Sequence, residues 1–238
     1  MKTLVQSFAI ILFVAFAFNA NAQKTKINGS GNVVTENRSV GEFDGISVGG
    51  AWNVTLKKGQ EGNLEISTDD NIMEHVDTYV KNGRLYVSTK DVYIKNVTRM
   101  NIVIHFNDIE SIKISGACDF EGEDEIRSKE FSLHSSGASK ISLHVNASEF
   151  EGKFSGASKA EIEGSAGSAR LSMSGAGSFH AYDFKTEDMK AEISGAGSAR
   201  VHVTNHLDAR VSGAGTIKYK GSPDVDKSVS GAGTVKGY

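Results

Sequence analysis

The sequence is poor in the residues that cross-link or kink a chain. Its 238 residues include one cysteine, Cys118, so no disulfide can form within the chain. We interpret Cys118 as a buried small residue, with a reactive or intermolecularly paired thiol as the alternative. One proline, Pro223, stands against 26 glycines, and aromatic residues make up only 8% of the chain. This composition fits a protein of strands and turns that is stabilised by stacking rather than by cross-links.

A strong charge of either sign is also missing. The chain has 26 lysines and arginines and 29 aspartates and glutamates, a formal net charge of -3. Binding to nucleic acid or to an anionic membrane surface relies on an excess of basic residues. The charge balance therefore argues against both kinds of partner.

Long hydrophobic runs are confined to the N-terminus. Lys2 precedes an apolar run over residues 8–18, and Ala20-Asn21-Ala22 matches the pattern of a signal-peptide cleavage site. The run is too short to cross a bilayer, and no later stretch is long enough. We expect residues 1–22 to be a signal peptide and Gln23 to begin the mature chain. The protein is then exported, either secreted or held in the cell envelope, in the periplasm or at the outer surface.

One tripeptide, Ser-Gly-Ala, recurs seven times in the second half of the chain. Successive copies begin 21, 19, 19, 20, 18 and 18 residues apart. A nearly fixed short period indicates one small unit stacked on copies of itself, because such a unit cannot bury an apolar face alone. The copies begin at Ser115, Ser136, Ser155, Ser174, Ser194, Ser212 and Ser230.

Positions counted from these serines alternate between apolar and polar residues. The residue five places after each serine is apolar in every copy, as in Phe120 and Ile141. The residue six places after is polar in every copy, as in Glu121 and Ser142. Alternation with a period of two is typical of a strand with one buried face, and no helical period sorts the residues this way.

Small residues also stand at fixed places in the repeat. Glycine follows every serine, and two places later comes glycine, serine or Cys118. Both places belong to the parity expected to face inward, where glycine suggests a sharp bend or a close backbone approach. The sequence therefore predicts an all-β fold. We expect a β-solenoid, a parallel β-helix-like stack of about seven glycine-rich coils of 18–21 residues, each with a corner at its Ser-Gly-Ala step.

The first half lacks the repeat but keeps the patterns of strands. Gly49-Gly50-Ala51 resembles a degenerate Ser-Gly-Ala step, and Asn82-Gly83 between two apolar stretches predicts a hairpin. Residues 70–76 fit one helical turn or a loop. We expect residues 23–238 to form a single domain, with irregular N-terminal coils over 23–110 and regular repeats over 111–238.

Motifs for catalysis or for cofactor binding are weak. Ser47 lies in a match to the hydrolase pattern G-x-S-x-G, but that motif works on a strand-to-helix turn and no helix pattern follows it. The glycine-rich steps lack the helix and the lysine of a phosphate site. The seven histidines show no metal-ligand spacing. We therefore expect no catalytic, cofactor-binding or metal-binding residues.

Two groups of charged residues remain candidates for a functional site. Glu161, His180 and Arg200 share one offset on neighbouring copies of the repeat. We interpret them as a solvated ladder in which Glu161 and His180 pair at low pH, with an acid–base site as the alternative. The three carboxylates from Glu123 to Glu125 could hold Ca²⁺, but they lack the intervening ligands of a calcium loop, so solvation is favoured.

Several segments together resemble one known family. The chain is similar, over nearly all of its mature length, to the putative auto-transporter adhesin, head GIN domain family, whose members are exported proteins frequent in Bacteroidetes. The resemblance implies a β-helix of glycine-rich coils and a surface or binding role, and it supplies no catalytic residues. It is carried by Phe43-Asp44-Gly45-Ile46, Val48-Gly49-Gly50-Ala51, Gly83-Arg84-Leu85-Tyr86-Val87, the Ser-Gly-Ala steps and Tyr219-Lys220-Gly221-Ser222-Pro223.

Three classes of function follow from these observations. The favoured one is an exported, non-enzymatic binding protein, adhesin-like, at the cell surface or secreted, whose polar face holds a glycan or a protein. A polysaccharide-processing β-helix enzyme is the alternative, and it would need clustered carboxylates, or a basic residue beside a calcium site, on one face. The third is a purely structural envelope component whose rod forms homo-oligomers through uncapped ends.

Overall fold

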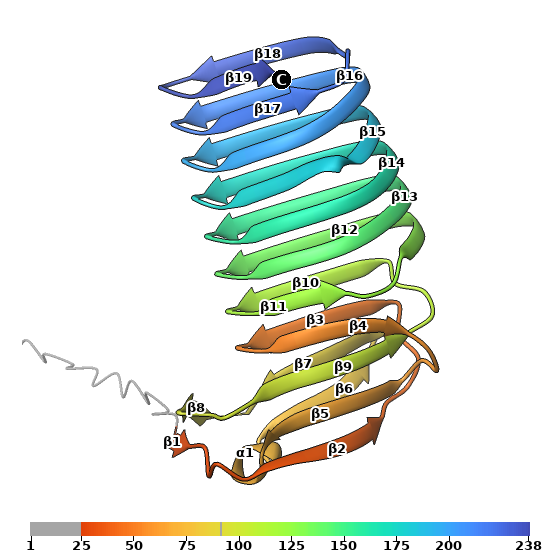
Figure 1. The fold of residues 1–238 in the computed structure, drawn as a ribbon, viewed down its shortest axis with the longest axis vertical. Coiled ribbons are helices and arrows are strands. Elements are labelled where there is room, and N and C mark those ends of the chain that lie inside the picture. Colours follow the sequence, from red (N-terminus) through yellow and green to blue (C-terminus); the bar gives the residue numbers. More distant parts are fainter. Residues whose placement is uncertain (1–24, 91) are drawn as a thin grey trace, which may run out of the picture.

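The Ser-Gly-Ala repeats wind into coils that stack along one axis (Figure 1). The computed structural model describes residues 25–90 and 92–238, so the expected signal peptide and its cleavage site lie outside the described residues. Nearly all regular structure is β-strand, in a β-solenoid of about seven turns, which confirms the predicted fold class. None of the helices in the described part of the chain is long and apolar enough to cross a membrane.

Parallel strands in register join each coil to the next. Equivalent positions of the repeat lie directly above one another, as the pairing of Ser136 with Ser155 and of Ser155 with Ser174 shows. The regular coils comprise β10 (Ser111–Gly116), β11 (Asp119–Gly122), β12 (Ile126–Gly137), β13 (Lys140–Gly156), β14 (Lys159–Gly175), β15 (Ser178–Gly195), β16 (Ser198–Gly213), β17 (Thr216–Lys220), β18 (Asp224–Ser230) and β19 (Thr234–Gly237).

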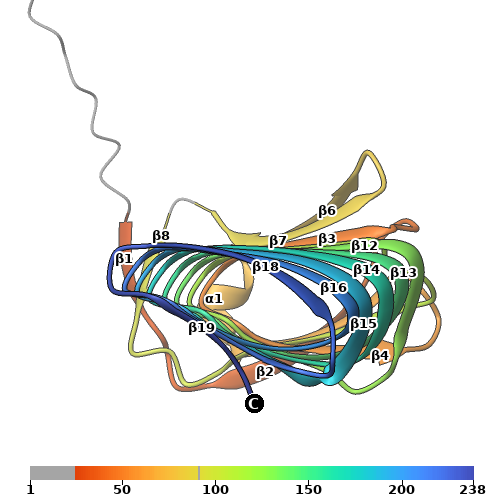
Figure 2. The same cartoon turned by 90° about the horizontal axis from the view of Figure 1, so that it is seen from above.

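Each coil is a flattened loop with a tight corner at one end and a broad bend at the other (Figure 2). The tight corner is the Ser-Gly-Ala step. Strands β13 to β16 run through the broad bend without a break, since the neighbouring coils bend with them and keep most of the ladder paired. We call the segments that precede each step the upstream face and the segments that follow it the downstream face.

The corner glycines adopt backbone conformations that suit glycine alone. Gly195 has a φ of 122°, and a Cβ atom there would lie 2.6 Å from the carbonyl oxygen of Gly175 on the coil before it. The next residue, Ala196, donates its N–H to that same carbonyl at 2.9 Å. The predicted bend and close approach are therefore confirmed. The glycines are exposed or half-exposed rather than inward, because the positive φ turns the chain and interrupts the alternation.

The inward positions build one continuous core. The place two residues after the corner glycine faces inward, and Cys118 lies there with 3% of its surface exposed. Burial raises the pKa of the Cys118 thiol, which fits the interpretation as a buried small residue. In the middle coils the core is aromatic, with ring centroids of Phe150 and Phe184 5.1 Å apart and those of Phe150 and Phe131 6.2 Å apart.

The stack extends below the repeats into the range that we expected to be irregular. Strands β3 (Gly45–Gly50) and β4 (Asn53–Lys58) form a coil under β10 and β11, with Gly50 in register with Gly116. The degenerate step at Gly49-Gly50-Ala51 is therefore a true corner. Strands β7 (Arg84–Thr89) and β9 (Met100–Phe106) pair parallel with β3 and β4 and add a further layer.

Antiparallel strands and one helical turn cover the N-terminal end of the stack. Strand β5 (Asn63–Asp69) pairs antiparallel with both β2 (Val33–Ser39) and β9. The predicted hairpin is β6 (Val76–Lys81) with β7, and both turn residues have positive φ, 52° at Asn82 and 71° at Gly83. The other elements here are α1 (Asp70–Met73) and the parallel pair of β1 (Thr25–Asn28) and β8 (Val92–Lys95).

Candidate functional site

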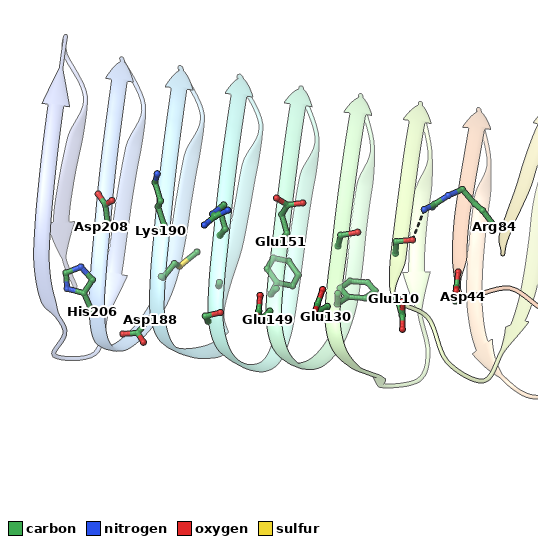
Figure 3. Close-up of a pocket in the computed structure, with 18 residues that line it drawn as sticks. Asp44, Arg84, Glu110, Glu130, Glu149, Glu151, Asp188, Lys190, His206 and Asp208 are labelled. Carbon is green, nitrogen blue, oxygen red and sulfur yellow. Dashed lines mark hydrogen bonds between the residues drawn. The ribbon is translucent and has the colours of Figure 1, made fainter. Parts of the chain in front are cut away.

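A groove of about 780 Å³ runs along the upstream face, across the stacked coils (Figure 3). It extends from Asp44 and Arg84 at one end to His206 and Asp208 at the other. It lies where the strands enter the upstream face from the broad bend. Because the coils are in register, side chains at one place of the repeat line up in columns about 4.8 Å apart.

Two such columns line the groove. In the five copies from Ser136 to Ser212, the acidic column stands six residues before the serine and the mixed column stands four residues before it. The acidic column consists of Glu130, Glu149, Ser168, Asp188 and His206, and the mixed column of Ser132, Glu151, Arg170, Lys190 and Asp208.

The carboxylates of the acidic column are open to a ligand. Glu130 and Glu149 are exposed and paired in register on neighbouring coils. Neither carboxylate forms a hydrogen bond or an ion pair with any residue in the described part of the chain. Further along, Asp188 accepts a hydrogen bond from Asn205 Nδ2 at 2.7 Å. The column therefore presents negative charge that the protein itself leaves largely unpaired.

The mixed column is held by ion pairs instead. The Lys153 ammonium group donates to Glu151 at 2.8 Å, and His134 Nε2 lies 3.2 Å from the other Glu151 oxygen. The hydrogen bond from Lys153 is the largest cause that holds the pKa of Glu151 below its usual range. Further up the stack, Arg210 contacts Asp208 at 2.9 Å. The contacts of Lys153 and Arg210 each lie within one strand and that of His134 joins two coils, and together they hold Glu151 and Asp208 in place.

Buried apolar side chains form the floor between the two columns. Phe131 and Phe150 are each 2% exposed, and Met189 is 4% exposed. The groove therefore offers mainly charged and hydroxyl groups to a ligand, with a smaller share of apolar surface. A smaller groove of about 430 Å³ lies beside it on the same face, lined by the exposed serines of the Ser-Gly-Ala steps and by Lys113, His134 and Lys153.

Ser47, the serine of the G-x-S-x-G match, lies inside a strand. It sits in the middle of β3, between Tyr86 on β7 and Lys113 on β10. The chain continues from β3 through the corner at Gly50 into β4. The strand-to-helix turn that would expose a nucleophilic serine is not formed here.

The three consecutive carboxylates at 123–125 turn to three different partners. Glu123 pairs with the Lys57 ammonium group at 2.8 Å, and Asp124 accepts the Lys58 backbone N–H at 2.8 Å. Glu125 contacts Arg127 and the amide of Asn146, and the Arg127 hydrogen bond is the main cause that lowers the pKa of Glu125. Their oxygens therefore do not converge on one point.

Glu161, His180 and Arg200 do lie side by side, on the downstream face. Glu161 lies 2.7 Å from the Lys159 ammonium group but 3.9 Å from His180 Nδ1. Burial, followed by the charges of Arg200 and Lys159, lowers the pKa of His180 despite the nearby carboxylate. The three residues therefore form the expected ladder, in which His180 lies within ion-pair distance of Glu161 when its imidazole is protonated and Lys159 is the nearer cation.

The columns of the upstream groove are the feature that our inspection of the sequence missed. The sequence does contain a pattern that marks the acidic column, because alignment of the copies from Ser136 onward places an acidic or polar residue six positions before each serine. The depth of the groove has no comparable pattern in the sequence, because it depends on the path that the strands take through the broad bend.

Comparisons with known proteins agree with this architecture. A crystal structure of a putative adhesin from Bacteroides fragilis NCTC 9343 is 26% identical, with a TM-score of 0.78, and the match covers 89% of this chain and all of the other. A putative adhesin from Parabacteroides distasonis ATCC 8503 is 23% identical, with a TM-score of 0.73 and coverage of 90% and 100%. No curated protein matches the sequence.

One further solved structure shares the fold under another name. It is described as a putative lipid binding protein from Parabacteroides distasonis ATCC 8503, 20% identical, with a TM-score of 0.66 and coverage of 90% and 100%. At this identity the likeness extends to the fold alone. The model of the family described as "Putative auto-transporter adhesin, head GIN domain" matches residues 42–223. The chain therefore belongs to the putative auto-transporter adhesin, head GIN domain family.

Proposed function

We propose that this chain is an exported, non-enzymatic binding protein, at the cell surface or secreted, that holds an extended polar ligand along the upstream groove. The ligand is a glycan or a segment of protein. The observation that carries the proposal is the groove itself, which crosses the stacked coils from Asp44 to Asp208 between two columns of regularly spaced polar groups. The description of the family as auto-transporter adhesins supports a role at the cell surface.

The spacing of the columns supports an extended ligand rather than a compact one. Each coil contributes one member to each column, so a ligand lying along the stack meets a new charge about every 4.8 Å. The exposed Glu130 and Glu149 accept hydrogen bonds from hydroxyl or ammonium groups, and Arg170 and Lys190 donate them. Such a surface adds many weak contacts along a chain instead of enclosing one small molecule.

The state of the groove carboxylates supports binding over catalysis. A general acid for glycoside cleavage needs a carboxyl group with a raised pKa. In Glu151 the pKa is shifted downward, mainly by the hydrogen bond from Lys153. Incubating the purified protein with polysaccharides and assaying new reducing ends tests the alternative enzyme. We expect no new reducing ends above those of a boiled control. New reducing ends that form with the wild type but not with Glu149→Gln would establish an enzyme instead.

Export is the second part of the proposal. The motivation is the Lys2 and Ala20-Asn21-Ala22 pattern, together with the surface role that the family description suggests. Intact-mass measurement of the protein recovered outside the cytoplasm should give a chain that begins at Gln23. A mass that retains residues 1–22, or recovery from the cytoplasm only, would contradict export.

A glycan array with matched charge reversals tests the binding surface. Glu149→Lys reverses an unpaired carboxylate in the groove, and Glu121→Lys makes the same change at an exposed position on the downstream face. We expect Glu149→Lys to lose signal on the glycans that the wild type binds, because a carboxylate that accepts hydrogen bonds from glycan hydroxyls is replaced by an ammonium group that only donates them. Glu121→Lys should match the wild type. Equal loss in both variants would mean that net charge, and not the groove, determines binding.

A further inference from the structure

The smaller groove on the upstream face, of about 430 Å³, differs in chemistry from the larger one beside it. It crosses the stacked coils from Ser47 on β3 to Ser174 on β14. The described residues that line it include Lys113, His134 and Lys153, and none of them is an aspartate or a glutamate. The smaller groove shares no lining residue with the upstream groove, so we treat it as a separate site.

The basic groups of the smaller groove form a row along the stack, one on each coil. Lys113 pairs in register with His134, and His134 with Lys153, so the two lysines lie about 10 Å apart. Lys153 donates to Glu151 at 2.8 Å, but an ammonium group has three donors and two remain. Lys113 is exposed and forms no ion pair within the described part of the chain. It therefore supplies a positive charge that the protein leaves uncompensated.

A row of serine hydroxyl groups runs beside the basic row. Ser115, Ser136, Ser155 and Ser174 are exposed and lie in register on successive coils. The hydroxyls of Ser115 and Ser136 donate to backbone carbonyl oxygens at 3.5 Å, which is long for a hydrogen bond. Those of Ser155 and Ser174 form no hydrogen bond with the described residues. A hydroxyl group both donates and accepts, so this row can bond to a ligand that is rich in hydroxyls.

The floor of the smaller groove is apolar. Ile114 and Phe154 lie beneath it and are 2% and 4% exposed, and the surface inside the groove is more apolar than polar. The alkyl stems of the two lysines add to this surface. A bare anion would leave it uncovered. A sugar ring covers it, because its faces carry C–H groups while its edge carries the hydroxyls.

Carboxylates beside the smaller groove limit the negative charge that a ligand can carry. Glu151 lies two residues from Lys153 along β13, and Glu149 of the acidic column lies four residues from it, about 13 Å at the rise of a strand. The chain as a whole has a formal net charge of -3. These charges disfavour nucleic acid and acidic peptides, and they favour a ligand in which hydroxyls outnumber the anionic groups.

We propose that the smaller groove binds an acidic glycan, a sugar chain that carries carboxylate or sulfate groups. Lys113 and Lys153 donate charge-assisted hydrogen bonds to the anionic groups, and the serine hydroxyls bond to the sugar hydroxyls. Carboxylate and sulfate oxygens accept such bonds alike, so the two kinds of glycan share one chemistry. The upstream groove, with its exposed carboxylates, suits neutral and amino sugars instead. Occupancy of the smaller groove therefore does not rest on the function proposed for the upstream groove.

Isothermal titration calorimetry on the full mature chain tests this site with a galacturonate hexasaccharide, its methyl ester and a sulfated galactose hexasaccharide. We expect at least one of the two acidic chains to bind, and which of them binds identifies the anionic group. The methyl ester keeps the hydroxyls but loses the charge, so it should not bind. Lys113→Gln should weaken binding by about tenfold, the effect of losing one hydrogen bond to a charged group. Lys113→Arg keeps the charge and should bind as the wild type does.

Two control variants separate this site from general effects of charge. Lys140→Gln removes the same charge at an exposed position on the downstream face and should leave binding unchanged. Glu149→Lys should keep binding within about twofold, because about 13 Å exceeds the screening length of about 8 Å at physiological ionic strength. The proposals for the two grooves therefore succeed or fail separately.

Three results would overturn the proposal. The first is that neither acidic hexasaccharide binds, and the second is that the methyl ester binds as tightly as the acid. The third is that Lys113→Gln and Lys140→Gln bind alike. A polyglutamate peptide serves as a further probe, since it carries carboxylates without hydroxyls. If it bound as tightly as the acidic sugars, charge alone would act and the assignment to a glycan would be wrong.

Discussion

The corner glycines are the residues on which the close stacking of the coils depends. Gly195 combines a φ of 122° with a neighbouring carbonyl oxygen 2.6 Å from where its Cβ would be. A side chain there must strain the backbone or push two coils apart, and each effect costs roughly 1–3 kcal/mol. We expect Gly195→Val to lower the free energy of unfolding by at least about 2 kcal/mol in urea melts.

Ser178→Val is the matched control for this change. Ser178 lies on the adjacent downstream face, half-buried and with ordinary strand geometry. The same side chain placed there should alter the free energy of unfolding by no more than about 0.5 kcal/mol. If the two variants had the same urea midpoint, the corner glycines would be unconstrained and the tight packing of the coils would have to be rejected.

Two histidines of the downstream face predict a specific pH dependence of stability. Burial is the main cause that lowers the pKa of His180 and of His202 below 6.5, followed by Arg200 at the first and Lys220 at the second. The unfolded chain therefore takes up these protons at a higher pH than the folded chain does. Stability contributed by the neutral imidazoles is complete above pH 6.5 and is lost as the pH falls below it.

The double variant His180→Gln and His202→Gln tests that dependence. Its free energy of unfolding, measured by urea melts at about pH 7 and about pH 5, should change less than that of the wild type, because two protons no longer link folding to pH. Carboxylates such as Glu151 and Glu192, whose pKa values are lowered, lose their contribution only in more acidic solution. Equal slopes for the two proteins would contradict the assignment to these histidines.

At the scale of the elements, the middle coils hold the densest part of the core. Phe150 is 2% exposed, and its ring contacts those of Phe131, Phe179 and Phe184 with centroids 5.1–6.2 Å apart. Deleting such a ring removes buried apolar surface and leaves a cavity. Phe150→Ala should therefore lower the free energy of unfolding by about 3–5 kcal/mol.

Val229→Ala is the comparison for that prediction. Val229 continues a neighbouring inward column, the one that holds Phe154 and Met173, but it lies in β18 on the outermost coil, where it is 43% exposed. Little surface is lost on truncation, so the expected change is below about 1 kcal/mol. Similar losses in both variants, measured by urea melts, would mean that the core is equally packed at the end and in the middle of the stack.

The elements divide into those that local pattern predicts and those that it does not. Alternation around the Ser-Gly-Ala steps predicts the strands, and Asn82-Gly83 predicts the β6–β7 hairpin. The layer order could not be predicted, because β3 pairs with β10 across an insertion that spans residues 59–110. Such pairings depend on contacts far apart in sequence and leave no local signal.

The candidate sites divide in the same way. The acidic column could be predicted from equal offsets before the serines, as at Glu130 and Glu149. The bulge in β15, where its pairing with β16 shifts, left a weaker trace, the longer interval between Ser174 and Ser194. That interval shows where extra residues enter β15, but it does not show how the strand accommodates them, since that depends on its pairing with β14 and β16.

At the scale of the whole molecule, the two ends of the stack differ. The N-terminal end is covered by antiparallel strands and by α1, whereas β18 and β19 form the outermost coil at the other end (Figure 1). The inward positions along β18 are Val225, Lys227 and Val229. They lie above the buried Leu207, Ala209 and Val211 of β16. A charged residue at an inward position discourages another strand from pairing with an edge.

We expect Lys227→Val to promote end-to-end self-association. The change would complete an apolar row with Val225 and Val229 on an open edge and remove the charge that opposes pairing. Analytical ultracentrifugation should show a sedimentation coefficient that rises with concentration for this variant. Lys236→Val, at an exposed outward position of β19, should behave as the wild type does. Identical sedimentation of the two variants would leave Lys227 without a protective role.

The central claim of this account is that the upstream groove is the surface by which the rod binds. Beads coated with the full mature chain and counted on whole cells measure this directly. Glu130→Lys combined with Glu149→Lys should lower adhesion by at least about tenfold, since two unpaired carboxylates of the groove are reversed.

The control reverses two exposed carboxylates outside the groove, Glu65 and Glu121, and so gives the same net charge. We predict that Glu65→Lys combined with Glu121→Lys keeps adhesion within about twofold of the wild type, because these changes lie away from the binding surface. Equal adhesion by the wild type and both double variants would contradict the claim that the groove binds.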